Sequence, residues 1–251
     1  MLALITGVGR KVGIGAAIAQ GLAEAGYQLA LSYHPKDDES QQGLSEPQQI
    51  VNDLRTDNIE VQGFAVDLSE ADAAAILMRN VNTQMGMCTV LVNNAAHSTS
   101  CTLDELTAEV LDAHYAVNTR GTALLCKAFA DQYEDAQHNG QARGRVINLT
   151  SGQGLGAMPT ELAYAASKGA VDALTVSLNV ALAPYGITIN AIDPGATDTG
   201  WMGDELQQDL LNAAPLGRLG QPVDAANLVR FLASSESGWI SGQVLRSRGG
   251  L

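Results

Sequence analysis

The sequence predicts an α/β fold, in which one doubly wound sheet of about seven parallel strands carries helices on both faces. Short β-rich runs alternate with helical patterns along the whole chain. The runs are almost continuously apolar, which is typical of strands that are covered on both sides. No linker-like, low-complexity or repeated segment divides the 251 residues, so residues 1–251 are expected to form a single domain.

Each of the first six expected strands is followed by a helical pattern, as parallel strands with crossover helices require. The strands are LALIT (2–6), YQLALSY (27–33), IEVQGFAVD (59–67), CTVLVNN (88–94), GRVINLTS (144–151), ITINAIDPG (187–195) and GQVLRS (242–247). The helices are expected at 14–25, 47–56, 70–85, in a long region up to about 136, at 162–183, and in segments up to 234. Two loops stand out: 34–46 is polar, and 195–215 is long enough to form a lid over a site.

Composition and charge narrow the classes of function. A content of 46% hydrophobic residues is enough for a substantial core. A net charge of −13 opposes binding to nucleic acid or to an anionic membrane, because both need a basic face. No apolar run approaches the roughly 18 residues of a membrane span, and a strand that begins at Leu2 leaves no room for a signal peptide. We therefore expect a soluble, cytoplasmic protein that binds a small molecule.

Neither the cysteines nor the histidines form a pattern that binds metal. The three cysteines, Cys88, Cys101 and Cys126, are widely spaced and form no CxxC motif. This spacing argues against a disulfide framework and against a zinc site. The four histidines are scattered without the spacing of ligands, so no metal site is expected.

The stretch TGVGRKVGIG follows the first strand and leads into a helix. In an open parallel sheet the ligand crevice lies beyond the carboxyl ends of the strands, where this turn lies. Gly7 suits the sharp exit from the strand, and Gly13 and Gly15 let the backbone approach a pyrophosphate at the helix N-terminus. However, Val12 and Ile18 stand where the usual G-x-G-x-x-G pattern needs its third glycine. The stretch is therefore either a phosphate cradle with altered spacing or a glycine-rich turn used for packing.

Tyr164 and Lys168 are suited to acid and base chemistry, because residues four apart share one face of a helix. An ammonium about 4 Å from the phenol, at an effective dielectric constant of about 20, favours the phenolate by about 4 kcal/mol. This predicts a pKa for Tyr164 close to 7 instead of about 10. A Y-x-x-x-K pair also arises by chance in roughly one such chain in ten. Ser151 lies at the crevice end of its strand, where its hydroxyl can hold a carbonyl oxygen for protonation.

Taken in chain order, the motifs resemble those of the short-chain dehydrogenase/reductase family over nearly the whole chain. The glycine-rich stretch resembles the TGxxxGIG signature of that family, with two extra residues between the first two glycines. The further matches are VD at 66–67, NNAA at 93–96, VN at 117–118, TS at 150–151, YAASK at 164–168 and DPGATDT at 193–199. Overall, the sequence looks similar to the β-ketoacyl carrier-protein reductase branch, a label that many reductases of unknown substrate share. The resemblance implies a Rossmann-type domain, and it favours an altered cofactor loop over a packing turn.

The resemblance also implies roles for the matching residues. Ser151 would position the substrate, Tyr164 would transfer the proton, and Lys168 would tune Tyr164 and hold the nicotinamide ribose. Asn118 would support a water-linked proton relay, although alone it could be a helix-bending or capping residue. Asp67 would contact the adenine, and Thr199 the carboxamide or the phosphates. The full expected cofactor set is Gly7, Arg10, Lys11, Gly13, Ile14, Gly15, His34, Asp67, Leu68, Asn93, Ala95, Tyr164, Lys168, Pro194, Gly195, Thr197 and Thr199.

Charge near the end of the second strand favours NADP(H) over NAD(H). Relatives that prefer NAD usually carry an acid there, which binds the ribose 2′-hydroxyl and would repel a 2′-phosphate. Here Tyr33 and His34 occupy this place, and Arg10 and Lys11 bring two cations to the glycine loop. Alternatively, Arg10 and Lys11 belong to an ordinary solvated surface and bind no phosphate, in which case NAD(H) is the cofactor.

Four features depart from the family pattern: the longer glycine loop, Ala96 where the family has glycine, a long loop after the second strand, and Arg246 and Arg248 where relatives often have an acid. We expect effects on the adenosine pocket and on subunit contacts, with the catalytic residues intact. The substrate is not specified by the sequence. Candidate pocket residues, each of which could equally serve packing, are His97, Gln153, Met158, Trp201 and Met202.

The leading hypothesis is an NADP(H)-dependent reductase of ketones or aldehydes that also runs in reverse. One alternative, from another class, is a catalytically silent protein that senses the cofactor. A third keeps hydride transfer within an isomerisation or dehydration, which the absence of an added substrate domain disfavours. Family members usually form tetramers through the helix that carries Tyr164 and Lys168 and through the last strand. The resemblance therefore implies a homo-oligomer, either a tetramer or a dimer.

Overall fold

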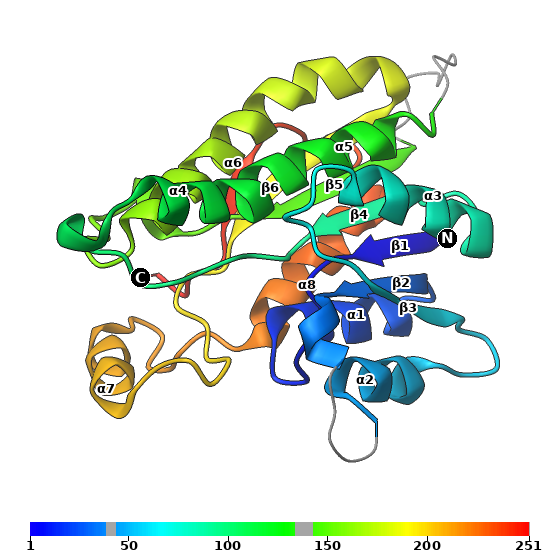
Figure 1. The fold of residues 1–251 in the computed structure, drawn as a ribbon. Helices are drawn as coiled ribbons and strands as arrows, with labels where there is room; N and C mark the ends of the chain where they lie inside the picture. The colour runs from blue at the N-terminus through cyan, green and yellow to red at the C-terminus, as the bar shows by residue number, and fades with distance from the viewer. Residues whose placement is uncertain (39–43, 134–142, 251) are drawn as a thin grey trace.

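The computed structural model describes residues 1–38, 44–133 and 143–250. In these ranges seven parallel strands form one sheet in the order β3-β2-β1-β4-β5-β6-β7 (Figure 1). The strands are β1 (Leu2–Ile5), β2 (Gln28–Tyr33), β3 (Val61–Ala65), β4 (Val90–Asn93), β5 (Gly144–Leu149), β6 (Ile187–Asp193) and β7 (Val244–Arg246). The predicted sheet of about seven parallel strands is confirmed.

The strand order reverses at β1, which pairs with β2 on one side and with β4 on the other. In the sheet register Leu4 lies between Ala30 and Leu91. Open parallel sheets bind ligands beyond the carboxyl ends of the strands at such a reversal. The glycine loop and the NNAA motif follow β1 and β4, so the topology brings both to this point.

Helices cover both faces of the sheet (Figure 1), as predicted. On one face lie α1, α2 and α8, and on the other lie α3, α5 and α6. The helices are α1 (Ile14–Glu24), α2 (Glu46–Leu54), α3 (Ala73–Met85), α4 (Ala108–His114), α5 (Thr122–Ala130), α6 (Leu162–Leu182), α7 (Asp204–Ala213) and α8 (Pro222–Ala233).

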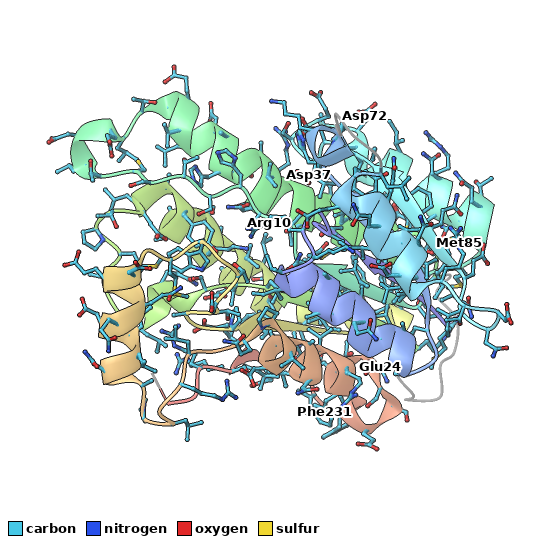
Figure 2. All side chains as sticks on the ribbon, turned by 90° about the horizontal axis from the view of Figure 1, so that it is seen from below. Arg10, Glu24, Asp37, Asp72, Met85 and Phe231 are labelled. Atoms are coloured by element: carbon cyan, nitrogen blue, oxygen red, sulfur yellow. The ribbon has the colours of Figure 1, made fainter. Side chains whose placement is uncertain are left out.

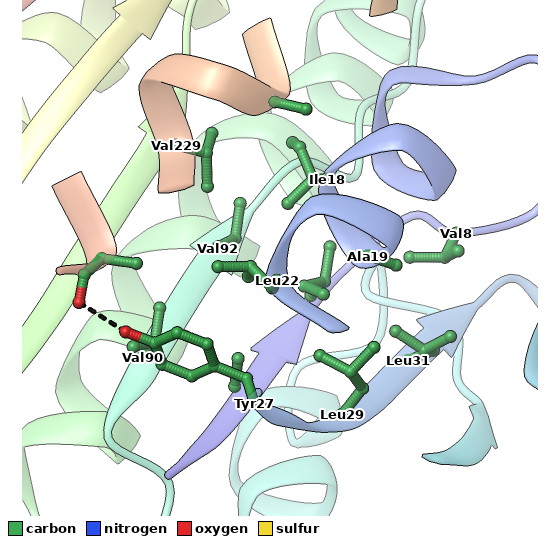
Figure 3. Packing of buried hydrophobic residues seen from close by; sticks show 14 of the residues in the cluster. Val8, Ile18, Ala19, Leu22, Tyr27, Leu29, Leu31, Val90, Val92 and Val229 are labelled. Atoms are coloured by element: carbon green, nitrogen blue, oxygen red, sulfur yellow. Dashed lines mark hydrogen bonds between the residues drawn. The ribbon is translucent and has the colours of Figure 1, made fainter. Parts of the chain in front are cut away.

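The strands other than the edge strand β7 supply side chains to two cores, one on each face of the sheet. Ala3 and Ile5 of β1 belong to the cluster under α1 and α8, whereas Leu2 and Leu4 belong to the cluster under α3 and α5. Successive side chains of a strand point to opposite faces, so a strand buried on both sides needs no polar residue. Figure 3 shows the first cluster from close by, with side chains of α1 and α8 packed over the strands.

The segment between β4 and β5 differs from the single long helical region that the pattern predicted. It contains the short 3₁₀ helix η2 (Leu103–Glu105), then α4, the π-helical segment η3 (Tyr115–Gly121) and α5. Asn118 lies inside η3, and π-helical turns are frequent at functional sites. Residues 134–136 of the expected helical region, and residues 39–43 of the expected polar loop, lie outside the described residues.

The expected lid segment, 195–215, contains α7. No residue of α7 is buried, and Figure 1 shows this helix standing apart from the sheet. A helix with so little packing is held weakly against the rest of the chain. Among the helices described, none combines the length and the apolar character needed to cross a membrane.

Candidate active site

The glycine loop leaves β1 through a backbone turn that only glycine adopts readily. Gly7 has a φ of 73°, and a Cβ there would lie 2.6 Å from the Cα of Ala95. Val8 then pairs with β2, because its N–H donates to the carbonyl of Ser32 at 2.9 Å. The longer part of the loop closes in a turn, in which the Gly13 N–H donates to the Arg10 carbonyl at 3.1 Å. The altered spacing is thus absorbed between residues 10 and 13.

Helix α1 begins at the end of this loop with Gly13 as its N-cap residue. Gly13 has no side chain to cap the helix, and the first turn of α1 contains no acidic residue. The N–H groups of a first helical turn have no partner within the helix, and together with the helix dipole they favour an anion. The loop therefore ends at a backbone site that suits a phosphate.

A pocket of about 440 Å³ lies over this loop at the carboxyl ends of β1, β2 and β4. Ten residues of the expected cofactor set line it: Gly7, Arg10, Gly13, Ile14, Gly15, His34, Asp67, Leu68, Ala95 and Thr199. Sequence reasoning missed further lining residues, or did not assign them to the cofactor: Gly9, Ser32, Tyr33, Asp37, Val66, Asn94, Ala96, His97 and Val117. The chain thus brings most of the expected residues together from five separate segments.

Seven residues of the expected cofactor set do not line the pocket: Lys11, Asn93, Tyr164, Lys168, Pro194, Gly195 and Thr197. The side chains of Lys11 and Asn93 face other parts of the chain. The backbone N–H of Lys11 donates to Glu46 at 2.7 Å, and its ammonium donates to Asp53 at 2.8 Å, so Lys11 faces α2 instead of the pocket. The side chain of Asn93 is buried and donates to Asn148 at 2.8 Å, which joins β4 to β5. Neither residue lines the pocket.

The motif after β6 also lies outside the lining of the pocket, except for Thr199. The Thr197 hydroxyl donates to the backbone carbonyls of Pro194 and Gly195, both at 3.3 Å, and so stabilises the loop itself. Gly195 has a φ of 67° and packs against Arg248, whose Cγ would lie 2.9 Å from a Cβ at Gly195. These residues shape the turn with which the lid segment begins.

Arg248 does not reach the adenosine pocket that we expected it to affect. Its guanidinium donates to both carboxylate oxygens of buried Asp193 at 3.1 Å. A Cβ at Gly152 would collide with the same guanidinium. Arg248 therefore lies beside the residue that follows Ser151, where it offsets a buried negative charge.

Asp37 is an acid that the sequence did not place at the site. It lies in the 3₁₀ helix η1 (Pro35–Asp38), and a Cβ at Gly9 would collide with its carboxylate. Arg10 is the nearby cation, and Figure 2 shows Arg10 and Asp37 at the same end of α1, opposite Glu24. No pattern in residues 34–38 shows that this turn folds back onto the glycine loop, so only the structure reveals the acid.

Two polar contacts cross the pocket. The guanidinium of Arg10 donates to the Thr199 carbonyl at 3.3 Å, which joins the glycine loop to the lid segment. His34 lies 3.4 Å from Asp67. Burial tends to raise the pKa of Asp67, but hydrogen bonds from Ser69 and the proximity of His34 outweigh this effect and lower it.

Helix α6 holds Tyr164 and Lys168 one turn apart, as the spacing predicts. Lys168 is 3% exposed, and its ammonium donates to the Leu149 carbonyl at the end of β5 at 2.7 Å. The same nitrogen lies 5.7 Å from the centre of the Tyr164 ring. Burial lowers the pKa of Lys168 to about 8, and the charge of Asp172 opposes this change.

The expected pKa of Tyr164 near 7 is wrong for this structure. Burial raises the pKa of Tyr164 to about 12, although a hydrogen bond with Ser151 opposes the rise. The negative charges of Glu161 and Asp193 raise it further. The prediction from spacing was wrong because it left out the loss of water around the phenolate and the two nearby carboxylates. Tyr164 is therefore a neutral phenol near pH 7.

Asn118 connects the loop after β4 to helix α6. Its side-chain oxygen accepts from the backbone N–H of His97 at 2.7 Å. Its amide group donates to the His97 carbonyl at 2.8 Å and to the Ser167 hydroxyl at 2.9 Å. Asn118 is fully buried, so these three bonds fix a pocket-lining residue relative to the helix of Tyr164 and Lys168.

A family model described as "Enoyl-(Acyl carrier protein) reductase" matches residues 7–251. The chain belongs to the short-chain dehydrogenase/reductase family. It is 44% identical over 249 residues to "Uncharacterized oxidoreductase YjdA" of Bacillus subtilis, and the alignment covers 99% of this chain and 96% of the relative. It is 32% identical over 252 residues to the 3-oxoacyl-(acyl-carrier-protein) reductase FabG of Staphylococcus aureus, with 99% and 97% covered.

Solved structures of the same family share the fold. A gluconate 5-dehydrogenase from Burkholderia cenocepacia, in complex with NADP and tartrate, superposes with a TM-score of 0.86 at 30% identity. The comparison covers 100% of this chain and 94% of that one. The resemblance stated from the motifs is confirmed, and the chain is an oxidoreductase of this family.

His97 is the one substrate-pocket candidate of this short-chain dehydrogenase/reductase that lines the pocket of the glycine loop. Its ring meets that of buried His114 edge-on, with 4.6 Å between the centres. Burial lowers the pKa of His97, and the proximity of His114 lowers it further. His97 is therefore a neutral imidazole near pH 7.

The other candidates lie outside that pocket. Gln153 donates to Asp172 at 2.5 Å, and the indole of Trp201 donates to a backbone carbonyl of the lid segment at 3.0 Å. Met158 is half-buried, and Met202 is buried. In the described part of the chain, no group of three or more His, Cys, Asp or Glu residues could hold a metal ion.

Proposed function

We propose that this chain is an NADP(H)-dependent carbonyl reductase, which reduces a ketone or an aldehyde and oxidises the corresponding alcohol in reverse. The observation that carries the proposal is the position of Tyr164, Ser151 and Lys168 at the carboxyl ends of the strands, tied through Asn118 to the glycine-loop pocket. Similarity to a 3-oxoacyl-(acyl-carrier-protein) reductase and to a structure in complex with NADP supports this reaction class.

The residues present fit a dinucleotide. The glycine loop and the open N-terminus of α1 suit the pyrophosphate, and Arg10 suits a 2′-phosphate. Asp67 and Thr199 line the same pocket, where Asp67 would accept a hydrogen bond from the adenine and Thr199 would approach the cofactor from the lid segment. We include α7 and its flanking residues in the proposal as a lid, because the helix is poorly packed and Arg10 already contacts this segment.

A bound nicotinamide dinucleotide supplies the hydride in reduction and accepts it in oxidation. In reduction, Tyr164 donates its proton to the substrate oxygen as negative charge develops there. Ser151 donates a hydrogen bond to the same oxygen and keeps it near the phenol. Lys168 stabilises the phenolate that is left, as long as its ammonium is protonated.

The raised pKa of Tyr164 predicts opposite pH dependences for the two directions. Reduction uses the neutral phenol and the Lys168 ammonium, so its kcat/KM should fall above about pH 8. Oxidation uses the phenolate, whose population rises with pH up to the pKa of about 12. We expect oxidation to accelerate from pH 7 to 10, measured as kcat/KM in both directions. A common optimum at pH 7 for both would contradict the assignment.

Asp37 should limit the preference for NADPH. A carboxylate near the glycine loop repels a 2′-phosphate more strongly than a 2′-hydroxyl. We expect Asp37→Asn to raise the NADPH/NADH affinity ratio by about three- to tenfold at low salt, with less effect at high salt. Fluorescence titration with both cofactors measures the ratio. The control Asp57→Asn removes a charge from an exposed site outside the pocket and should leave the NADPH/NADH affinity ratio unchanged. An equal rise of the ratio in both variants would contradict the role given to Asp37.

We also propose that the chain forms a homo-oligomer through α6 and the edge of the sheet at β7. Helix α6 exposes Val176 and Val180, and Trp239, close to β7 in the chain, is 95% exposed. Large apolar side chains in such positions are typical of surfaces that another subunit covers.

A further inference from the structure

A second pocket lies at the end of the sheet where the strands begin, opposite the end that carries the candidate active site. It has a volume of about 350 Å³ and opens where β4 and β5 begin and α8 ends. In a parallel sheet the amino ends of all strands lie on one side and the carboxyl ends on the other. The full length of the strands therefore separates this pocket from the glycine loop. The reaction proposed above uses none of its residues.

Three arginines line this second pocket: Arg143, Arg145 and Arg230. The chain has 14 Lys and Arg residues against 27 Asp and Glu residues, so a group of three cations without an acid is unusual for it. Within residues 1–38, 44–133 and 143–250, no Asp or Glu lines the pocket, and the ion pairs involve none of the three arginines. The pocket is therefore strongly positive in a negative protein.

Arg145 forms the buried part of this cluster, with 7% of its surface exposed. Its guanidinium donates to the carbonyls of Ser234 at 3.3 Å and Gly144 at 3.2 Å. The Ser234 carbonyl lies just after the end of α8, where the helix dipole favours a cation such as Arg145. A carbonyl, however, carries no full negative charge that would balance the guanidinium. Buried guanidinium groups are rarely left without an anionic partner.

The two tyrosines beside Arg145 do not supply that anion. Tyr27 donates its hydroxyl proton to the Ala233 carbonyl at 2.8 Å (Figure 3), and Tyr133 donates to the Cys88 carbonyl at 3.2 Å. Burial raises the pKa of both phenols, so both are neutral near pH 7. The charge of Arg145 thus faces only neutral groups in the described structure.

We propose that this pocket binds a phosphate group, either free or carried by a small metabolite. Arg145 forms the floor, and Arg143 and Arg230, which are exposed, approach from the rim. Guanidinium groups bind phosphate oxygens through paired, charge-assisted hydrogen bonds. Ser235 lies in the same lining, and its hydroxyl offers a further donor, whereas the Thr89 hydroxyl already donates to the Leu2 carbonyl at 3.2 Å. The volume leaves room for more than one phosphate or for a small organic group.

Calorimetric titration of the full chain with pyrophosphate tests the site. We expect binding that weakens as salt rises, and a loss of about tenfold in affinity in each of Arg143→Gln and Arg230→Gln. Arg79→Gln removes an exposed arginine outside the pocket, and Arg10→Gln removes the cation of the glycine loop. Both controls should keep the affinity of this site within about twofold of the unchanged chain.

Two further probes identify the source of the phosphate. Tighter binding of glycerol 3-phosphate than of inorganic phosphate indicates a phosphorylated metabolite, and the reverse order indicates a free phosphate. The proposal is overturned if none of the three probes binds at about 10 mM, a concentration at which even weak sites fill. It is equally overturned if Arg143→Gln and Arg230→Gln bind as the unchanged chain does, or if only Arg10→Gln loses binding, because the glycine loop would then hold the anion.

Discussion

Replacing Tyr164 by Phe should lower kcat by about 10²- to 10⁴-fold and leave the affinity for NADPH nearly unchanged. The change removes only the hydroxyl that is proposed to carry the proton. Because Tyr164 is largely buried and its hydroxyl bonds with Ser151, the phenyl ring of the variant fits the same space. Steady-state turnover of a panel of ketones with NADPH, together with fluorescence titration of the cofactor, measures both quantities.

Tyr185→Phe is the matched control, because Tyr185 lies beyond the far end of α6 and packs against the core. It should keep the activity of the unchanged chain. If Tyr164→Phe reduces ketones as fast as Tyr185→Phe, the proposed proton donor is wrong. If the unchanged chain binds NADPH and turns over no carbonyl or alcohol, the cofactor-sensing alternative gains support instead.

Replacing Lys168 by Met should lower kcat by about 10²-fold without lowering the melting temperature. An ammonium 5.7 Å from the ring stabilises a phenolate by about 3 kcal/mol at an effective dielectric constant of about 20. Burial of the Lys168 ammonium is itself unfavourable, because it lowers the pKa of Lys168 to about 8. Methionine removes that cost, while the Leu149 carbonyl loses its donor, a change worth about 1–3 kcal/mol. The two effects on stability roughly cancel.

The dependence of stability on pH distinguishes this account from a purely structural one. The pKa of Lys168 is lower in the folded chain, about 8, than its ordinary value of 10.5, so protonation favours unfolding. The stability of the unchanged chain relative to Lys168→Met should therefore rise between pH 8 and about 10. Thermal melts of both proteins over this range measure the difference, with Lys127→Met as an exposed control. A constant difference across the range would contradict a buried, depressed lysine.

Local patterns predicted the architecture well. The alternation of apolar strands and helices is confirmed, and the five inner strands β2, β1, β4, β5 and β6 are apolar because they are buried on both faces. The segment around Asn118 could not be predicted in detail. Its π-helical turn depends on hydrogen bonds to His97 and Ser167, 21 and 49 residues away.

The sequence by itself determined that Tyr164 and Lys168 share a helix face and that glycines line the first turn, since both follow from spacing along one segment. Only the tertiary structure decided what those groups face. It turned Lys11 away to Asp53 and brought Asp37 against Gly9. It also packed protein around half-buried Tyr164, which reversed the expected direction of its pKa shift. Charge and burial depend on segments far apart in the chain, and their distances are set by packing, which no local pattern encodes.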